Sequence, residues 1–368
     1  MPSAPRARPA VVTEVGTLLA PALLGPILPR IVRDIAALPG CSKTAQALEP
    51  KLAATCGRML FPGGLTAATR RAGGEPCVTG RPQPYDPSTL RRNLKAMATA
   101  GATAVVERAV ESQVERAVEC TEHAAVAHTD MFDQPYYTKQ PAHAGPIGAL
   151  NNKLLAAVYF GVTTVRPEGG PVLVYHLSWH KPATQLAVAV KDLHASPSRH
   201  AWLTAHLRRH TWDRGGNSLP LRQYAQAQRI PYLTVANGWV YLSMQHTPVA
   251  QTLDRQKVFV HRDTRMGHTL ATPLEDGPRV VIFPAHPNQG VSCLRGLRYL
   301  TNSALKGDEL LRMDKVYKAR WPEMENPLKA LEAVGFGVNR DRRLELATSR
   351  GIDGQIERLD AKDDALNV

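Results

Sequence analysis

The stretch that decides the fold is HAAVAHTDMFDQPYYTK, residues 123–139. Its apolar run, residues 124–127, has the length of a buried β-strand, and Pro135 opposes continuation of that strand. Asp130 is therefore expected at the exit of a strand, held by a buried element. A carboxylate at such a place can hold a metal ion, or it can cap the following turn.

The charge of the chain favours a polyanionic partner. Among 368 residues, 45 are Lys or Arg and 32 are Asp or Glu, which gives a formal net charge of +13. With 43% hydrophobic residues, the chain can bury one large core or form two domains. The basic excess favours nucleic acid as a partner, and a basic surface that serves only solubility is the alternative.

The cysteines and the N-terminal residues favour a cytoplasmic protein. There are five cysteines, an odd number, and none forms a CxxC pair, so neither a disulfide framework nor a zinc site is indicated. Residues 17–29 are apolar, but they are too few to span a bilayer and include three prolines. No membrane segment is expected.

The order of the periodic segments predicts a mixed α/β layer. Asp86 or Ser88 caps a helix that stops at Gly101, and a second helix covers residues 102–119. Beyond residue 123 strands come first, and helices alternate with strands afterwards. The predicted strands are 153–165, 170–179 and 230–236 with a β-rich stretch at 239–298, and the predicted helices are 181–193, 198–210, 219–229 and 303–318.

Two later stretches join Asp130 in a common chemistry. Asp213 lies in a Gly-rich loop, WDRGGNS, where the backbone can approach a ligand closely. The third stretch, residues 317–326, reads YKARWPEMEN and carries Glu323 and Glu325. Two Asp at strand ends and a Glu near a later helix suit Mg²⁺ or Mn²⁺, and two such ions can promote displacement at phosphorus.

Five motifs in this order resemble the DDE transposases of bacterial insertion sequences, which have an RNase H-like catalytic core. Residues 130–139 are similar to the family's first-Asp segment, D-x-x-D-x-P-Y-Y-G-K, and residues 213–215 to its D-R-G segment. Residues 229–234 (RIPYLT) match the usual continuation, and residues 299–302 (YLTN) resemble the lead into the last helix. Residues 317–326 are similar to the Y-x-x-R-W…E-N box. The resemblance covers about residues 120–335.

This resemblance implies an activity and a site. Asp130, Asp213 and Glu325 would be the catalytic carboxylates that hold two Mg²⁺ or Mn²⁺ ions. The element's ends would be cleaved, and the freed 3′-OH would attack target DNA. His128 is expected to pack or to support the site from behind. The expected DNA contacts are Tyr317, Arg320, Lys139, Arg214, Arg91 and Arg92. The expected partners are double-stranded DNA, as terminal repeats and target, and a second copy in a homodimer at the bacterial nucleoid.

The chain departs from the family pattern near its third carboxylate. The family's Glu stands four residues after its Arg, but that position here is Met324. Glu325 is favoured because Asn follows it, and Glu323 remains the alternative. Pro322 suits a first helical turn, whereas Pro327 would disturb a helix interior. A catalytically inactive DNA-binding relative and a general nuclease are therefore the competing functions.

The resemblance also implies a domain layout. We expect a mixed five-stranded sheet with helices on both faces, a β-rich insertion and a helical N-terminal domain. The predicted limits are 1–119 for a DNA-end-binding region, 120–238 with 299–336 for the RNase H-like core, 239–298 for the insertion and 337–368 for a charged tail.

Overall fold

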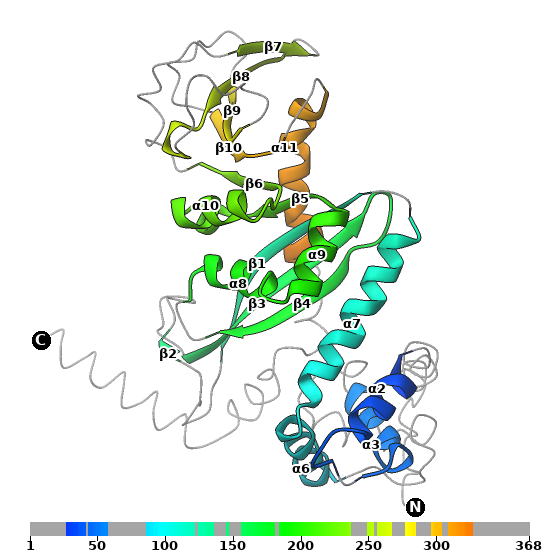
Figure 1. The fold of residues 1–368 in the computed structure, drawn as a ribbon. Helices are drawn as coiled ribbons and strands as arrows, with labels where there is room; N and C mark the ends of the chain where they lie inside the picture. Colours follow the sequence, from blue (N-terminus) through cyan, green and yellow to red (C-terminus); the bar gives the residue numbers. More distant parts are fainter. Residues whose placement is uncertain are drawn as a thin grey trace, which may run out of the picture. The chain divides into compact units, whose positions relative to one another are not determined.

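The protein was analysed as a computed structural model (Figure 1). It describes residues 27–41, 43–57, 86–121, 124–135, 145–146, 156–180, 184–236, 249–253, 256–266, 277–284, 296–303 and 308–326. These residues form two compact units. Residues up to Ala109 belong to the first unit, and those from Val110 onward belong to the second, apart from Pro135.

The first unit is helical in its described part. Its helices are α2 (Leu28–Ala36), α3 (Ala45–Gly57), α6 (Pro87–Thr99) and the first turns of α7 (Ala102–Glu119). Apolar side chains from these helices form one core. The predicted cap of α6 is present, because the Asp86 carboxylate accepts the N–H groups of Ser88 and Thr89 at 2.8 and 3.2 Å. Gly101, at φ 91°, makes the turn into α7.

The second unit is built on one mixed sheet, in the order β2-β3-β1-β5-β6-β10-β9-β8-β7, with β4 paired to β3. Strands β1, β5 and β6 run parallel. The pairs β2–β3, β3–β4, β6–β10, β9–β10, β8–β9 and β7–β8 are antiparallel. The strands are β1 (Ala125–Pro135), β2 (Gly145–Pro146), β3 (Ala156–Pro167), β4 (Leu173–His180), β5 (Leu207–Trp212), β6 (Tyr232–Val235), β7 (Val249–Leu253), β8 (Gln256–Arg262), β9 (Arg279–Pro284) and β10 (Gly296–Thr301).

Helices cover both faces of this sheet (Figure 1). They are α8 (Leu186–Leu193), α9 (Pro197–His206), α10 (Leu219–Ala227) and α11 (Asp308–Arg320). On one face, Ala125 and Ala127 of β1 pack with Val118 of α7 and Leu203 of α9. Because side chains alternate along a strand, His128 and Asp130 point to the opposite face, where the helix α11 lies.

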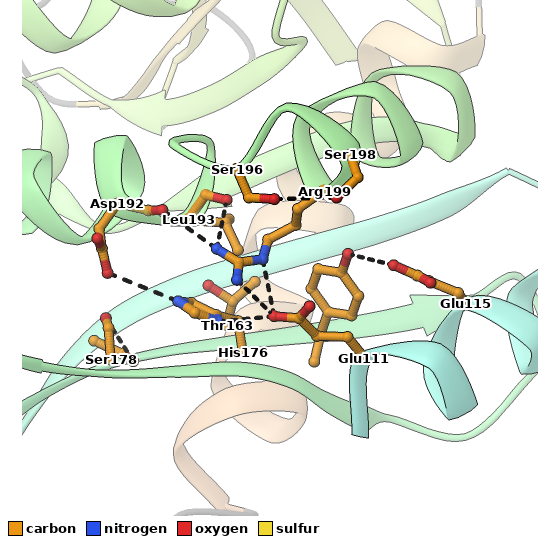
Figure 2. Close-up of polar contacts among 12 residues, drawn as sticks. Glu111, Glu115, Thr163, His176, Ser178, Asp192, Leu193, Ser196, Ser198 and Arg199 are labelled. Carbon is orange, nitrogen blue, oxygen red and sulfur yellow. Dashed lines mark hydrogen bonds and ion pairs between the residues drawn. The ribbon is translucent and has the colours of Figure 1, made fainter. Parts of the chain in front are cut away.

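A buried polar cluster ties α7 to this core (Figure 2). Glu111 accepts a 2.9 Å hydrogen bond from Nε of Arg199, and Nδ1 of His176 lies 3.2 Å from the same oxygen. Burial alone would raise the pKa of Glu111, but the bond with His176 and the charge of Arg199 lower it below its ordinary value. The carboxylate of Glu111 on α7 therefore joins His176 of β4 and Arg199 of α9.

The mixed α/β class is confirmed, with three corrections to the predicted elements. The helix expected at 198–210 ends at His206, and residues 207–212 form strand β5. Strand β1 does not end at Asp130 but continues to Pro135. Strands β7, β8 and β9, which fall inside the predicted insertion, extend the same sheet antiparallel to β6 through β10. Within the described ranges, no helix is both long and apolar enough to cross a membrane.

Candidate active site

Two neighbouring parallel strands bring Asp130 and Asp213 to one place. Strand β1 pairs with β5, and the last residues in register are Thr129 and Trp212. Asp130 directly follows Thr129, and Asp213 directly follows Trp212 at the end of β5. Adjacent strands lie about 4.8 Å apart, so the two aspartates are neighbours. Strand β1 continues to Pro135 beyond its pairing with β5, so the end of the β1–β5 pairing, rather than the end of β1, positions the first carboxylate.

The loop after β5 fixes Asp213. Its carboxylate accepts the N–H of Gly215 at 2.7 Å, and its carbonyl oxygen accepts the hydroxyl of Thr234 at 2.9 Å. A Cβ atom at Gly216 would lie 2.2 Å from Cδ1 of the buried Trp212. The glycine at 216 therefore allows the loop to turn tightly against the core.

The third carboxylate comes from the end of α11. Residues Trp321–Glu325 continue this helix as a π-helical turn. Pro322 has no N–H group, so it cannot donate the α-helical bond to the carbonyl of Lys318, and a π turn is one way to absorb this loss. The wider turn brings Glu325 beside Arg320, which stands five residues earlier in the sequence. Oε1 of Glu325 lies 3.2 Å from Nη2 of Arg320. The prediction that Pro322 opens a helix is wrong, since it lies inside a continuous one.

Arg320 is the centre of the cluster. Its Nη1 is 2.5 Å from Oδ2 of Asp130, and its Nη2 contacts Glu325. Burial alone would lower the pKa of Arg320, but nearby negative groups, first Asp130 and also Asp213 and Glu325, raise it above its ordinary value. One guanidinium thus lies within the electrostatic reach of all three predicted carboxylates.

The environment of Asp130 perturbs its carboxyl group. Burial raises the pKa of Asp130 from 3.8 to about 6, the charge of Arg320 opposes this rise, and the charge of Asp213 adds to it. Its side chain is 19% exposed. A carboxyl that titrates near pH 6 beside a second carboxylate is typical of functional sites.

Tyr317 and Trp321 border the cluster in different ways. The ring of Tyr317 packs on Tyr299, with centroids 5.3 Å apart, and the guanidinium carbon of Arg320 lies 5.9 Å from its centroid. Burial raises the pKa of the Tyr317 hydroxyl. Trp321, by contrast, is 54% exposed, and Arg214 is exposed on the loop that follows Asp213.

Glu323 has a different environment from Glu325. It is buried, with Oε2 2.8 Å from Nε2 of His128 and Oε1 paired with Arg166. Burial alone would raise its pKa, but the bond with His128 and the charge of Arg166 lower it. The other ring nitrogen of His128 contacts the hydroxyl of Thr211. Glu323 is therefore held in the protein interior, and Glu325 is the carboxylate that joins Asp130 at Arg320.

The remaining predicted DNA contacts are Arg91, Arg92 and Lys139. Arg91 and Arg92 are exposed on α6, which belongs to the first unit. Lys139 lies outside the described residues.

Sequence reasoning did not identify Arg166 or Arg209 as residues of interest. The only signal for Arg209 was the basic pair Arg208-Arg209 inside strand β5, whose other residues are buried.

The donor chemistry of the cluster fits a hard divalent cation. Asp130, Asp213 and Glu325 offer only carboxylate oxygens, which Mg²⁺ and Mn²⁺ prefer. Within the described ranges, no group of three or more His, Cys, Asp or Glu lies close enough to hold a metal ion as arranged. Arg320 instead supplies the positive charge between Asp130 and Glu325.

Comparison with known proteins adds no relative: no protein-family model matches the sequence, and no curated protein matches it either.

Proposed function

We propose that the chain is a DNA transposase of the DDE type, with Asp130, Asp213 and Glu325 as its catalytic carboxylates. The observation that carries the proposal is the cluster at Arg320. Arg320 contacts Asp130 of β1 and Glu325 after α11. Asp213 directly follows Trp212, the residue of β5 that pairs with Thr129 of β1. Two metal ions that clamp the attacking and leaving oxygens of a displacement at phosphorus are held by carboxylate oxygens of this kind.

The sheet supports the RNase H-like part of this proposal. Strands β4-β3-β1-β5-β6 form a mixed part of the ten-stranded sheet that has the five strands implied by the family resemblance. Strands β7, β8 and β9 lie in sequence between Asp213 and Glu325, where related enzymes carry a β insertion.

The cluster would hold Mg²⁺ or Mn²⁺ through the oxygens of Asp130, Asp213 and Glu325. Such ions supply charge stabilisation at phosphorus and activation of the attacking oxygen. Arg320 would then exchange its contacts with these carboxylates for a contact with DNA phosphate, to which its planar guanidinium is suited.

Exposed side chains around the cluster suit a DNA surface. Arg214 follows Asp213 directly and is exposed, and the exposed ring of Trp321 can stack on a base. The net charge of +13 agrees with a polyanionic partner. Arg91 and Arg92 on α6 are proposed to contact the terminal repeats.

A catalytically inactive DNA-binding relative is the second candidate. The observation that favours it is the pairing itself, because Arg320 already compensates Asp130 and Glu325 at 2.5 and 3.2 Å. A guanidinium that stays in this place would exclude a metal ion by charge and volume.

Strand cleavage on labelled duplex DNA separates the two candidates. The duplex carries the repeats that flank the coding sequence, with Mg²⁺ or Mn²⁺, and the proteins are wild type, Asp213→Asn and Glu325→Gln. Cleavage at the repeat ends that both substitutions abolish supports the transposase. Binding without cleavage by the wild type supports the inactive relative, and cleavage of any duplex without end preference supports a general nuclease.

A further inference from the structure

A cavity lies on the α11 face of the sheet, beside the buried Glu323. Its volume is about 320 Å³, and residues from β1, the β3–β4 turn, β5 and α11 line it. Basic side chains dominate the polar part of its wall. They are Arg166, Arg208, Arg209, Arg312 and Lys315.

Arg209 is the unusual member of this wall. It is only 4% exposed, and its Nε is buried without a hydrogen-bond partner. No described residue forms a hydrogen bond or an ion pair with its guanidinium. Burial, and secondarily the charge of Arg208, lower its pKa to about 10, so the side chain still carries its charge at neutral pH. A buried charge without a counterion is costly, so an anionic ligand that pairs with Arg209 would be bound favourably.

A β-bulge directs two arginines into the cavity. The register of β1 and β5 shifts between Ala125, opposite Leu207, and Val126, opposite Arg209, so Arg208 is the extra residue. Bulges change the direction of side chains and are common beside functional sites. Without the bulge, strand alternation would send Arg208 and Arg209 to opposite faces, whereas both line this cavity.

The acidic residues of the wall compensate only part of its positive charge. Arg208 pairs with Glu309 and lies 3.8 Å from Glu168, and Arg166 pairs with Glu323. Arg209, Arg312 and Lys315 have no acidic partner among the described residues. The wall therefore has an excess of positive charge around one buried guanidinium.

We propose that this cavity binds a phosphate group, with Arg209 as the deep ligand and Arg312 and Lys315 at its rim. A tetrahedral dianion satisfies the bare guanidinium with charge-assisted hydrogen bonds, and the volume admits a group of pyrophosphate size. The phosphate group could belong to a free phosphate compound or to a DNA backbone. The inference does not depend on the proposed catalytic function.

Calorimetric titration with pyrophosphate tests the proposal on the full chain. We expect saturable binding by the wild type and about a 10- to 100-fold higher Kd in Arg209→Met, because one charged hydrogen-bonding group is lost. Arg116→Met, an exposed arginine of the same unit, is the matched control and should bind as the wild type does. The thermal unfolding midpoint of Arg209→Met in phosphate-free buffer should be no lower than that of the wild type. A structural guanidinium would instead give a lower midpoint.

A second variant and a competitor complete the test. The double variant Arg312→Gln, Lys315→Gln changes two exposed positions on α11, so it tests the proposal even if Arg209→Met does not fold. Its Kd for pyrophosphate should be about tenfold higher than that of the wild type. If a 20-base-pair duplex displaces pyrophosphate, the natural ligand is a backbone phosphate, and if it does not, the ligand is a free phosphate compound. Equal pyrophosphate affinity in the wild type and the cavity variants, or no binding by any protein, would overturn the proposal.

Discussion

Arg320 and Glu325 lie on the same side of one helix although they are five residues apart, and Nη2 of Arg320 is 3.2 Å from Oε1 of Glu325. A π turn inserts the equivalent of one residue into the helix, so it places the fifth residue where an α-helix places the fourth. In a regular helix Met324 would take this position. The π turn therefore brings Glu325, rather than Met324, to the guanidinium of Arg320.

The first prediction concerns Pro322. Pro322→Ala restores the missing N–H, so the turn should return to α-helical register and move Glu325 away from Arg320. We expect cleavage of repeat-end DNA to fall about 100-fold, as for a catalytic group displaced by about 1 Å, with unchanged far-UV circular dichroism. Pro220→Ala, at the exposed start of α10, is the control and should cleave normally. Full activity of Pro322→Ala would show that the π turn is not needed.

The second prediction separates the two glutamates by stability. Glu323→Gln removes the charge that pairs with His128 and Arg166 in the interior, so the free energy of unfolding should fall by about 2 kcal/mol. Glu325→Gln, at the half-buried end of the same turn, should lower it by less than about 1 kcal/mol. Urea denaturation at pH 7.5 measures both values. A larger loss of stability in Glu325→Gln than in Glu323→Gln would contradict this assignment, because it would make Glu325 the structural glutamate.

The third prediction uses the perturbed carboxyl of Asp130. Its pKa is about 6 in the folded protein and about 3.8 in a free carboxyl, so the folded state binds the proton more tightly. Stability therefore falls as the pH rises from about 4 to about 6, and the loss persists above pH 6. Between pH 4 and pH 7 the free energy of unfolding should decrease less in Asp130→Asn than in the wild type. The difference between the two proteins should be at most about 3 kcal/mol.

Denaturation by urea at half-unit pH intervals gives this comparison. Asp34→Asn, which changes an exposed carboxylate of α2, is the control and should keep the wild-type pH profile. A profile of Asp130→Asn that overlays the wild type would show that Asp130 does not titrate near pH 6.

The fourth prediction concerns the two glycines after Asp213. In Gly216→Ala the new methyl group would overlap the buried Trp212 ring, and we expect a loss of about 1–3 kcal/mol in stability. In Gly215→Ala the methyl group would lie 3.0 Å from Oδ1 of Asp213, so stability should change little while the carboxylate shifts. Thermal unfolding and DNA cleavage of both variants distinguish these effects. A Gly216→Ala protein as stable as the wild type would contradict the proposed close approach.

Parts of this fold could be predicted from local sequence patterns. Asp86 as a helix cap and the strand–turn–strand around Gly169 follow from short-range chemistry, and both are present in the structure. These elements depend on neighbours in the sequence.

Strand β5 could not be predicted because its polar residues are satisfied by distant ones. His210 contacts the hydroxyl of Thr129, and Thr211 contacts His128, both across the sheet. The residue pattern LRRHTW shows no apolar strand, and tertiary pairing overrides it. The bridge from Arg320 to Asp130 spans 190 residues, and no periodic pattern contains such information.

The proposed function requires that Asp130, Asp213 and Glu325 together hold divalent metal. Calorimetric titration of Mn²⁺ into the protein bound to repeat-end DNA at pH 7.5 tests it most directly. We predict saturable binding by the wild type, loss of that binding in Asp130→Asn, Asp213→Asn and Glu325→Gln, and retention in Glu323→Gln. Mn²⁺ affinity that none of the first three substitutions changes would contradict the claim.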